Sequence, residues 1–98
     1  MGILQEISLW ATETFPTKDV PDFYKKLDGL IIHMEREIEE LKDNPQDVLE
    51  AADIIILAAH FIGLQGYNPD DVVAGKHGVN KLRKWKEPDG QGVVEHEE

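Results

Sequence analysis

The stretch NPQDVLEAADIIILAAHFIGLQ, residues 44–65, decides the fold. Asn44 is suited to cap a helix and Pro45 to occupy its first position, so we predict a helix over residues 45–65. Apolar side chains cover almost the whole circumference of this helix. They are Val48, Leu49, Ala51, Ala52, Ile54, Ile55, Ile56, Leu57, Ala58, Ala59, Phe61 and Ile62. A chain of 98 residues can scarcely surround such a helix, so we expect other copies of the chain to cover part of it.

Three further helices are predicted on either side of this stretch, over residues 3–14, 22–43 and 69–86. Pro21 and Asp22 open the second of them, and Asn68 with Pro69 opens the last, after a left-handed Gly66. Residues 22–43 carry one apolar stripe at helical spacing, made of Leu27, Leu30, Ile31, Met34, Ile38 and Leu41. The sequence therefore predicts a single all-α domain over residues 1–98, with residues 87–98 as an extended tail.

The composition excludes several classes of protein. Twenty acidic and ten basic residues give a formal net charge of −10, which argues against a protein that coats nucleic acid. The absence of cysteine excludes disulfides, thiolate zinc sites and a cysteine nucleophile. No stretch is apolar enough to span a bilayer, and the first ten residues do not resemble a signal peptide. We expect an acidic protein of the cytoplasm that binds neither membranes nor nucleic acid.

Two carboxylate pairs at i, i+3 spacing interrupt the apolar faces. Glu37 and Glu40 lie on the predicted helix 22–43, and Glu50 and Asp53 lie on the predicted helix 45–65. Buried carboxylates that face one another repel, and divalent cations between them remove the repulsion. Carboxylate oxygens favour Mg²⁺ or Mn²⁺ over zinc. We therefore predict a metal site at these four residues; the alternative is that Glu37 and Glu40 belong to a solvated acidic face.

Two histidines lie at helical spacing from these carboxylates, one on each of the two predicted helices. His33 precedes Glu37 by four residues, and His60 follows Asp53 by seven. Either side chain could orient a carboxylate ligand, or could be an ordinary buried or half-exposed histidine.

A basic stripe follows near the end of the chain, where residues 76–86 hold five bases and no acid. Lys76, Asn80 and Arg83 lie on one face of the predicted helix 69–86. Beside a metal-binding acidic cluster, such a face could hold the oxygens of a polyphosphate. Alternatively, it offsets the acidic helix in ion pairs. No glycine-rich phosphate loop is present.

The motifs together resemble the MazG-like all-α nucleoside triphosphate pyrophosphohydrolases. The resemblance rests on Glu37-x-x-Glu40, on Glu50-x-x-Asp53 and on Lys76-x-x-x-Asn80-x-x-Arg83. The stretches LWATETFP (residues 9–16), HMEREIEEL (residues 33–41), NPQDVLEAADIIIL (residues 44–57) and NKLRKW (residues 80–85) are similar to the phage-type dATP/dGTP diphosphohydrolases, also called MazZ. This resemblance covers nearly the whole chain.

The resemblance implies a MazG-like four-helix bundle assembled from subunits as a homodimer or homotetramer. It implies hydrolysis of dATP and dGTP to a deoxynucleoside monophosphate and pyrophosphate, which in such phages can serve the synthesis of 2-aminoadenine DNA. Two or three Mg²⁺ or Mn²⁺ ions would be held by Glu37, Glu40, Glu50 and Asp53, which are also the catalytic residues. The triphosphate would be held by Lys76, Asn80 and Arg83.

Aromatic side chains are the candidates for binding the base. We expect Trp10, in the N-terminal segment, to contact the purine, because aromatic rings stack on bases; packing in the core is the alternative. The substrate alternatives are dUTP, dCTP or other nucleoside triphosphates. The alternative from another class is a non-catalytic acidic helical interaction protein.

Overall fold

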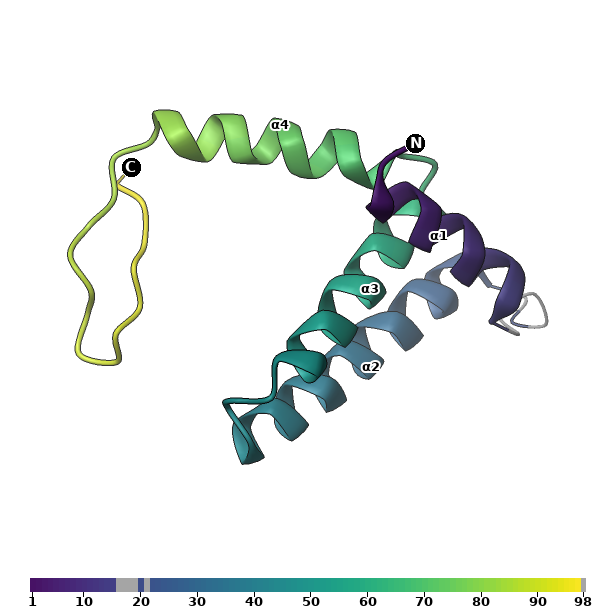
Figure 1. Cartoon of the computed structure of the whole chain (residues 1–98), viewed down its shortest axis with the longest axis horizontal. Helices are drawn as coiled ribbons and strands as arrows, with labels where there is room; N and C mark the ends of the chain where they lie inside the picture. The colour runs from purple at the N-terminus through teal and green to yellow at the C-terminus, as the bar shows by residue number, and fades with distance from the viewer. Residues whose placement is uncertain (16–19, 21, 98) are drawn as a thin grey trace.

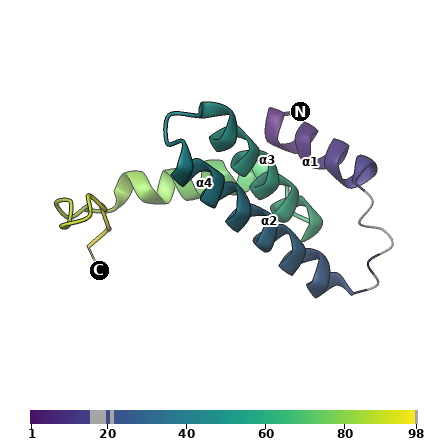
Figure 2. The same cartoon turned by 90° about the horizontal axis from the view of Figure 1, so that it is seen from below.

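The computed structural model describes residues 1–15, 20 and 22–97, and that part of the chain folds into four helices without a β-strand. They are α1 (Ile3–Thr14), α2 (Phe23–Asp43), α3 (Val48–Leu64) and α4 (Pro69–Leu82). The predicted all-α class is therefore confirmed. Helices α2 and α3 lie side by side and antiparallel, and α1 packs on the other side of α3 (Figures 1 and 2). Helix α4 extends away from this group (Figure 1).

Side-chain caps set the starts of three helices. Asp22 accepts a hydrogen bond from the Tyr24 N–H at 2.8 Å, and Asn68 caps α4 ahead of Pro69, as predicted. The predicted start of the third helix at residue 45 is wrong, because Asn44 is the C-cap of α2. Asp47 caps α3 instead, by accepting hydrogen bonds from the N–H groups of Leu49 and Glu50. Gly66 has the expected left-handed backbone, with φ +88°; Pro16 and Pro21 lie outside the described residues.

The C-terminal part of the chain also differs from the prediction, since α4 ends at Leu82 and not at residue 86. The Trp85 indole N–H donates a hydrogen bond to the Asn80 carbonyl, which folds the chain back at this point. The predicted tail is extended but not loose. Its backbone pairs with residues 84–86 through hydrogen bonds such as Lys86 N–H to the Glu95 carbonyl, and it turns at Gly92 with φ +79°.

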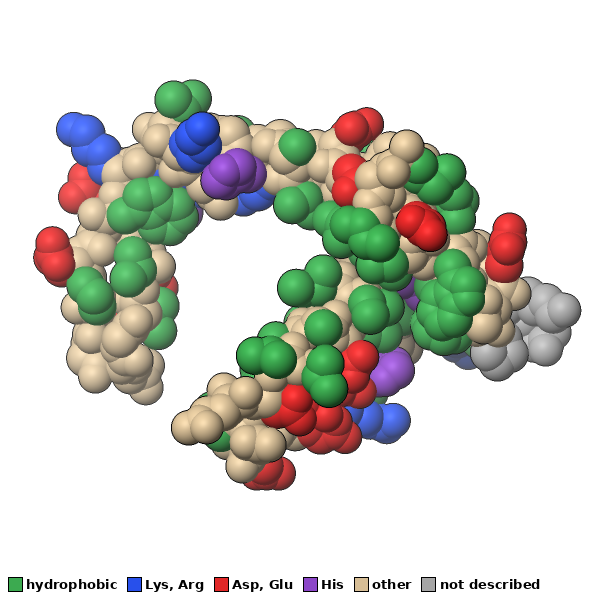
Figure 3. Space-filling view, viewed as in Figure 1, with side chains coloured by type: hydrophobic (Ala, Val, Ile, Leu, Met, Phe, Trp, Pro, Cys, Tyr) green, Lys and Arg blue, Asp and Glu red, His purple; other side chains and the backbone are tan. Residues whose placement is uncertain are grey.

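The described residues bury little apolar surface. The buried hydrophobic side chains are Ala11, Leu30, Leu57 and Ala59. Within one chain α3 is not surrounded as its composition predicts, because α1 and α2 cover only part of it. Val48 is 76% exposed, Leu49 73% and Ile55 55%. Figure 3 shows hydrophobic side chains on the α3 side of a hollow that separates α4 from the α2–α3 pair.

No single helix in the described ranges is long and apolar enough to cross a membrane. Helices α3 and α4 reach that length only when they are taken together, and the chain bends by 106° between them.

A carboxylate from α4 joins the first and last helices. The N-cap residue of α1 is Gly2, which has no side chain to accept hydrogen bonds. Asp70 supplies the missing acceptor, because its carboxylate receives the N–H groups of Leu4 at 3.3 Å and Gln5 at 2.9 Å. Gly2 lies so close to Asp70 that a Cβ at this position would clash with the carboxylate. The start of α4 is thereby fixed to the start of α1.

We predict that Asp70→Ala lowers the free energy of unfolding by about 1–2 kcal/mol, the usual effect of losing a helix cap. Asp71→Ala is the matched control, because Asp71 lies in the same first turn of α4 but is exposed. It should cost only a few tenths of a kcal/mol. Urea denaturation of both variants at one protein concentration measures the difference. Equal destabilisation would show that Asp70 does not cap α1.

Candidate metal centre

Three of the four predicted carboxylates come together between α2 and α3. Glu37 and Glu40 lie one turn apart on α2, and the short turn after α2 places Glu50, in the first turn of α3, opposite them. One carboxylate oxygen from each residue lies within 4.8 Å of the others. Acidic side chains are visible together on this arm of the molecule in Figure 3.

The electrostatics of Glu37 and Glu50 are coupled. The neighbouring Glu37 carboxylate, together with burial, raises the pKa of Glu50 to about 7. The same contact lowers the pKa of Glu37, so that a proton on Glu50 is held against an ionised Glu37. One Glu50 oxygen is shielded from solvent and has no hydrogen-bond donor among the described residues. Either a proton or a cation must therefore satisfy this pair.

The donor set of this cluster fits a hard divalent cation. All three side chains offer carboxylate oxygens, the ligands that Mg²⁺ and Mn²⁺ prefer. Beside them, His33 places its Nε2 atom 3.3 Å from a Glu37 oxygen, where it can hold that carboxylate in position. Of the two roles considered for His33, the structure therefore favours that of orienting a carboxylate.

Asp53 lies outside this trio but borders the same groove. Its side chain is exposed, and together with Glu37, His33 and Phe15 it lines a pocket of about 190 Å³. The fourth predicted ligand is thus one turn along α3 from Glu50, at the edge of the cluster.

His60 is not near the carboxylate cluster. It is fully buried, with its ring 5.6 Å from that of Phe15, and neither nitrogen has a hydrogen-bond partner in the described part of the chain. Burial lowers the pKa of His60, so the ring is neutral at pH 7. Of the two roles considered for His60, the structure favours that of a buried packing residue.

The basic stripe lies on a different part of the molecule. Lys76 and Asn80 line a cavity of about 320 Å³ between α3 and α4, with apolar neighbours such as Ile62 and Val73. Arg83 is the C-cap of α4 and no longer on the helix. Helix α4 diverges from the end of the α2–α3 pair that carries the carboxylates (Figure 1). The basic stripe therefore does not reach the carboxylates of the same chain.

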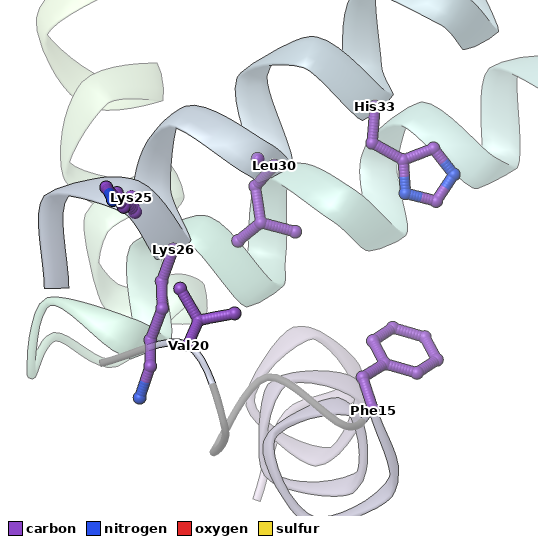
Figure 4. A pocket seen from close by; sticks show the side chains of 7 residues that line it. Phe15, Val20, Lys25, Lys26, Leu30 and His33 are labelled. Carbon is purple, nitrogen blue, oxygen red and sulfur yellow. The ribbon is translucent and has the colours of Figure 1, made fainter. Parts of the chain in front are cut away.

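The aromatic residues of the N-terminal segment are half-exposed. Trp10 is 53% exposed and contacts Phe15 edge to face, with ring centroids 5.3 Å apart. Phe15 in turn faces His33 across a second cavity (Figure 4), which is lined mostly by residues that sequence patterns did not single out. A glycine at position 29, inside the amphipathic helix 22–43, was the available signal for it.

Comparisons with known proteins agree with the interpretation of the carboxylate cluster as a metal site. No family model matches the chain. A curated dATP/dGTP diphosphohydrolase of cyanophage S-2L is 34% identical over 70 residues, which are 69% of this chain and 66% of the relative. A solved structure of the cyanophage S-2L MazG-like pyrophosphohydrolase, bound to dGDP and three catalytic Mn²⁺ ions per active site, superimposes with a TM-score of 0.69.

That superposition covers 97% of this chain and 94% of the solved one, at 30% sequence identity. Likeness of sequence and fold over almost the whole length agrees with the carboxylate cluster between α2 and α3. The chain therefore belongs to the phage-type MazG-like pyrophosphohydrolases.

Proposed function

We propose that this chain hydrolyses dATP and dGTP to a deoxynucleoside monophosphate and pyrophosphate. The observation that carries the proposal is the convergence of Glu37, Glu40 and Glu50 from two helices on a space suited to cations. The relative from cyanophage S-2L is named for dATP and dGTP, which supports these substrates over dUTP and dCTP. A panel of deoxynucleoside triphosphates, with chromatography of the products, tests the choice.

Glu37, Glu40, Glu50 and Asp53 would hold two or three Mg²⁺ or Mn²⁺ ions. When bound, such ions neutralise phosphate charge and make water more acidic. The protein's part is to fix the carboxylates: α2 and α3 set their spacing, and His33 holds Glu37. In the reaction, water attacks the α-phosphorus, the bond from it to the bridging oxygen breaks, and pyrophosphate leaves.

Lys76, Asn80 and Arg83 would bind the departing phosphates, and we propose that they come from a second copy of the chain. In one chain this stripe lies on α4, which diverges from the acidic arm (Figure 1). The exposed apolar side chains of α3 offer a surface for such a copy. A homodimer or homotetramer would cover α3 and place basic side chains against the triphosphate, where an arginine can bind phosphate with two hydrogen bonds.

The proposed setting is the control of deoxynucleotide pools in the cytoplasm of a phage host. Removal of dATP there, with release of dGMP from dGTP, would suit the synthesis of 2-aminoadenine DNA. The binding partner in this proposal is a small deoxynucleotide and neither a nucleic acid nor a membrane.

We predict that Glu50→Gln lowers kcat at least about 100-fold, because it removes a charged metal ligand with little change in shape. Glu39→Gln is the matched control, since Glu39 is exposed on α2 and only pairs with Lys42. Pyrophosphate release measures turnover, and circular dichroism checks that both variants keep their helices. Wild-type turnover by Glu50→Gln would remove Glu50 from the site.

Metal affinity should depend on pH through Glu50. Its pKa of about 7 means that the metal-free protein carries a proton there below pH 7 and has lost it above pH 7. A bound ion must displace that proton, so Mn²⁺ affinity should fall by up to about tenfold per pH unit below pH 7 and level off above it. Calorimetric Mn²⁺ titrations from pH 6 to 8.5 measure this dependence. The same titration of Glu50→Gln should lack the pH-dependent step; its persistence would contradict the assignment to Glu50.

Mixing two variants of low activity tests the proposed shared site. We expect Lys76→Ala to lower kcat/KM at least about tenfold, because a phosphate contact is lost. If the basic stripe acts on another copy, an equimolar mixture of Lys76→Ala and Glu50→Gln, exchanged after partial denaturation, should recover about a quarter of the wild-type activity per site, because one pairing in four joins two intact halves. A mixture no more active than its components would place the stripe and the carboxylates in one chain.

A further inference from the structure

His60, on α3, is a titratable group that the proposed metal site does not use. The side chain is 0% exposed, and neither ring nitrogen has a hydrogen-bond partner among the described residues. A neutral imidazole has one N–H donor and one acceptor nitrogen, and burying them unpaired costs free energy. Protonation would make both nitrogens donors and add a charge, which raises that cost. A proton on His60 therefore opposes the packing around it.

Helix α1 covers this stretch of α3 (Figure 2). Its buried residues are Ser8 and Ala11, and Ser8 lies so close to Gly63 that a Cβ there would clash with its hydroxyl. Phe15, at the end of α1, places its ring 5.6 Å from that of His60, which lies one turn before Gly63. The buried imidazole is therefore part of the contact between α1 and α3.

Helix α1 depends on this contact more than α2 does. It has 12 residues, and isolated helices shorter than about 12–15 residues are marginal in water. Apart from its packing on α3, its first turn is held by the Asp70 carboxylate. Helix α2 has 21 residues and is joined to α3 by a short turn. Loss of packing at His60 would therefore free the end of α1 before it separates α2 from α3.

A charge on His60 would have no ion-pair partner in the described part of the chain. Ionisable groups line the two hollows beside its neighbour Phe15, namely Lys25, Lys26, His33, Glu37 and Asp53. The other helices packed on α3 carry Glu6 and Glu13 on α1, and Asp70, Asp71, Lys76 and His77 on α4. None of these groups hydrogen-bonds to the His60 ring, and burial alone lowers its pKa.

We propose that His60 is a pH-sensitive latch, whose neutral ring packs α1 on α3 and whose protonation releases α1. Helix α1 carries Phe15, which lines the pocket that also contains Glu37 and Asp53. Release of α1 therefore removes one wall of the hollow beside the carboxylate cluster. The latch follows from the packing of α1 alone, so it holds whether or not the chain hydrolyses dATP and dGTP.

The direction of the pH dependence follows from the lowered pKa of His60. A histidine in a released or unfolded segment has a pKa of about 6.5, and burial lowers the value in the packed state. Between the two values the released state binds more protons, so acid favours release. The packing of α1 is therefore complete above about pH 6.5 and weakens by up to about tenfold per pH unit below it.

Amide hydrogen exchange at pH 7.5 and 5.0, resolved into peptides by mass spectrometry and corrected for intrinsic rates, measures the release. The full chain is kept free of divalent ions, so that metal binding does not contribute. We expect α1 of the wild type to lose at least about fivefold of its protection at pH 5.0, with a limit of about thirtyfold for a group of pKa 6.5. Peptides of α2 and α3 should lose less than twofold.

His60→Gln and His60→Leu separate the proton from the packing, because neither side chain can be protonated. In both variants α1 should lose less than twofold of its protection at pH 5.0. His60→Leu should melt no lower than the wild type at pH 7.5, since it replaces an unpaired polar group by an apolar one; His60→Gln decides the test if the leucine variant does not fold. His33→Gln and His77→Gln are the matched controls, because both histidines are exposed, and both should lose protection as the wild type does.

Several results would overturn the latch. Full protection of α1 in the wild type at pH 5.0 would show that acid does not release this helix. The same loss in the His60 variants as in the wild type, or its disappearance in His33→Gln, would assign the proton to another group. Equal losses in α1, α2 and α3 would show that acid unfolds the whole chain and does not release α1.

Discussion

The repulsion among Glu37, Glu40 and Glu50 is the constraint around which this protein is organised. Three ionised carboxylates with oxygens within 4.8 Å of one another repel. The raised pKa of Glu50 reflects this repulsion. The fold nonetheless holds them there, on two helices joined by a turn of four residues. Such an arrangement is stable only with protons or cations between the side chains, and the family to which the chain belongs includes a relative solved with three Mn²⁺ ions.

The scaffold that imposes this repulsion is small and is tied together by polar contacts as much as by its core. Asp47 begins α3 at the position that sets Glu50 opposite α2, and Asp70 caps α1 from α4. Few apolar side chains are buried, and several on α3 stay exposed. These exposed side chains and the distance of Lys76 from the acidic arm both have the same explanation in our proposal: a second copy of the chain completes the core and the site together.

Two hollows of different chemical character lie along one face of α2. Glu37 and Asp53 line the hollow toward the C-terminal half of α2, and Leu30 lines a more apolar cavity toward its N-terminal half. His33 stands between the two halves, in contact with Glu37 on one side and facing Phe15 on the other.

The sequence by itself determined four helices, the starts of α2 and α4, and two carboxylate pairs on facing helices, because periodicity and capping are local properties of the chain. The cap of α3 by Asp47 is also a local feature, which our prediction of Asn44 as the cap missed. Only the tertiary structure decided that the tail returns as a hairpin on Trp85 and that α4 carries its basic stripe away from the acids. It also brought Phe15 to α2 to close a cavity. These features depend on packing angles and on contacts between residues far apart in the chain, which helical spacing does not encode.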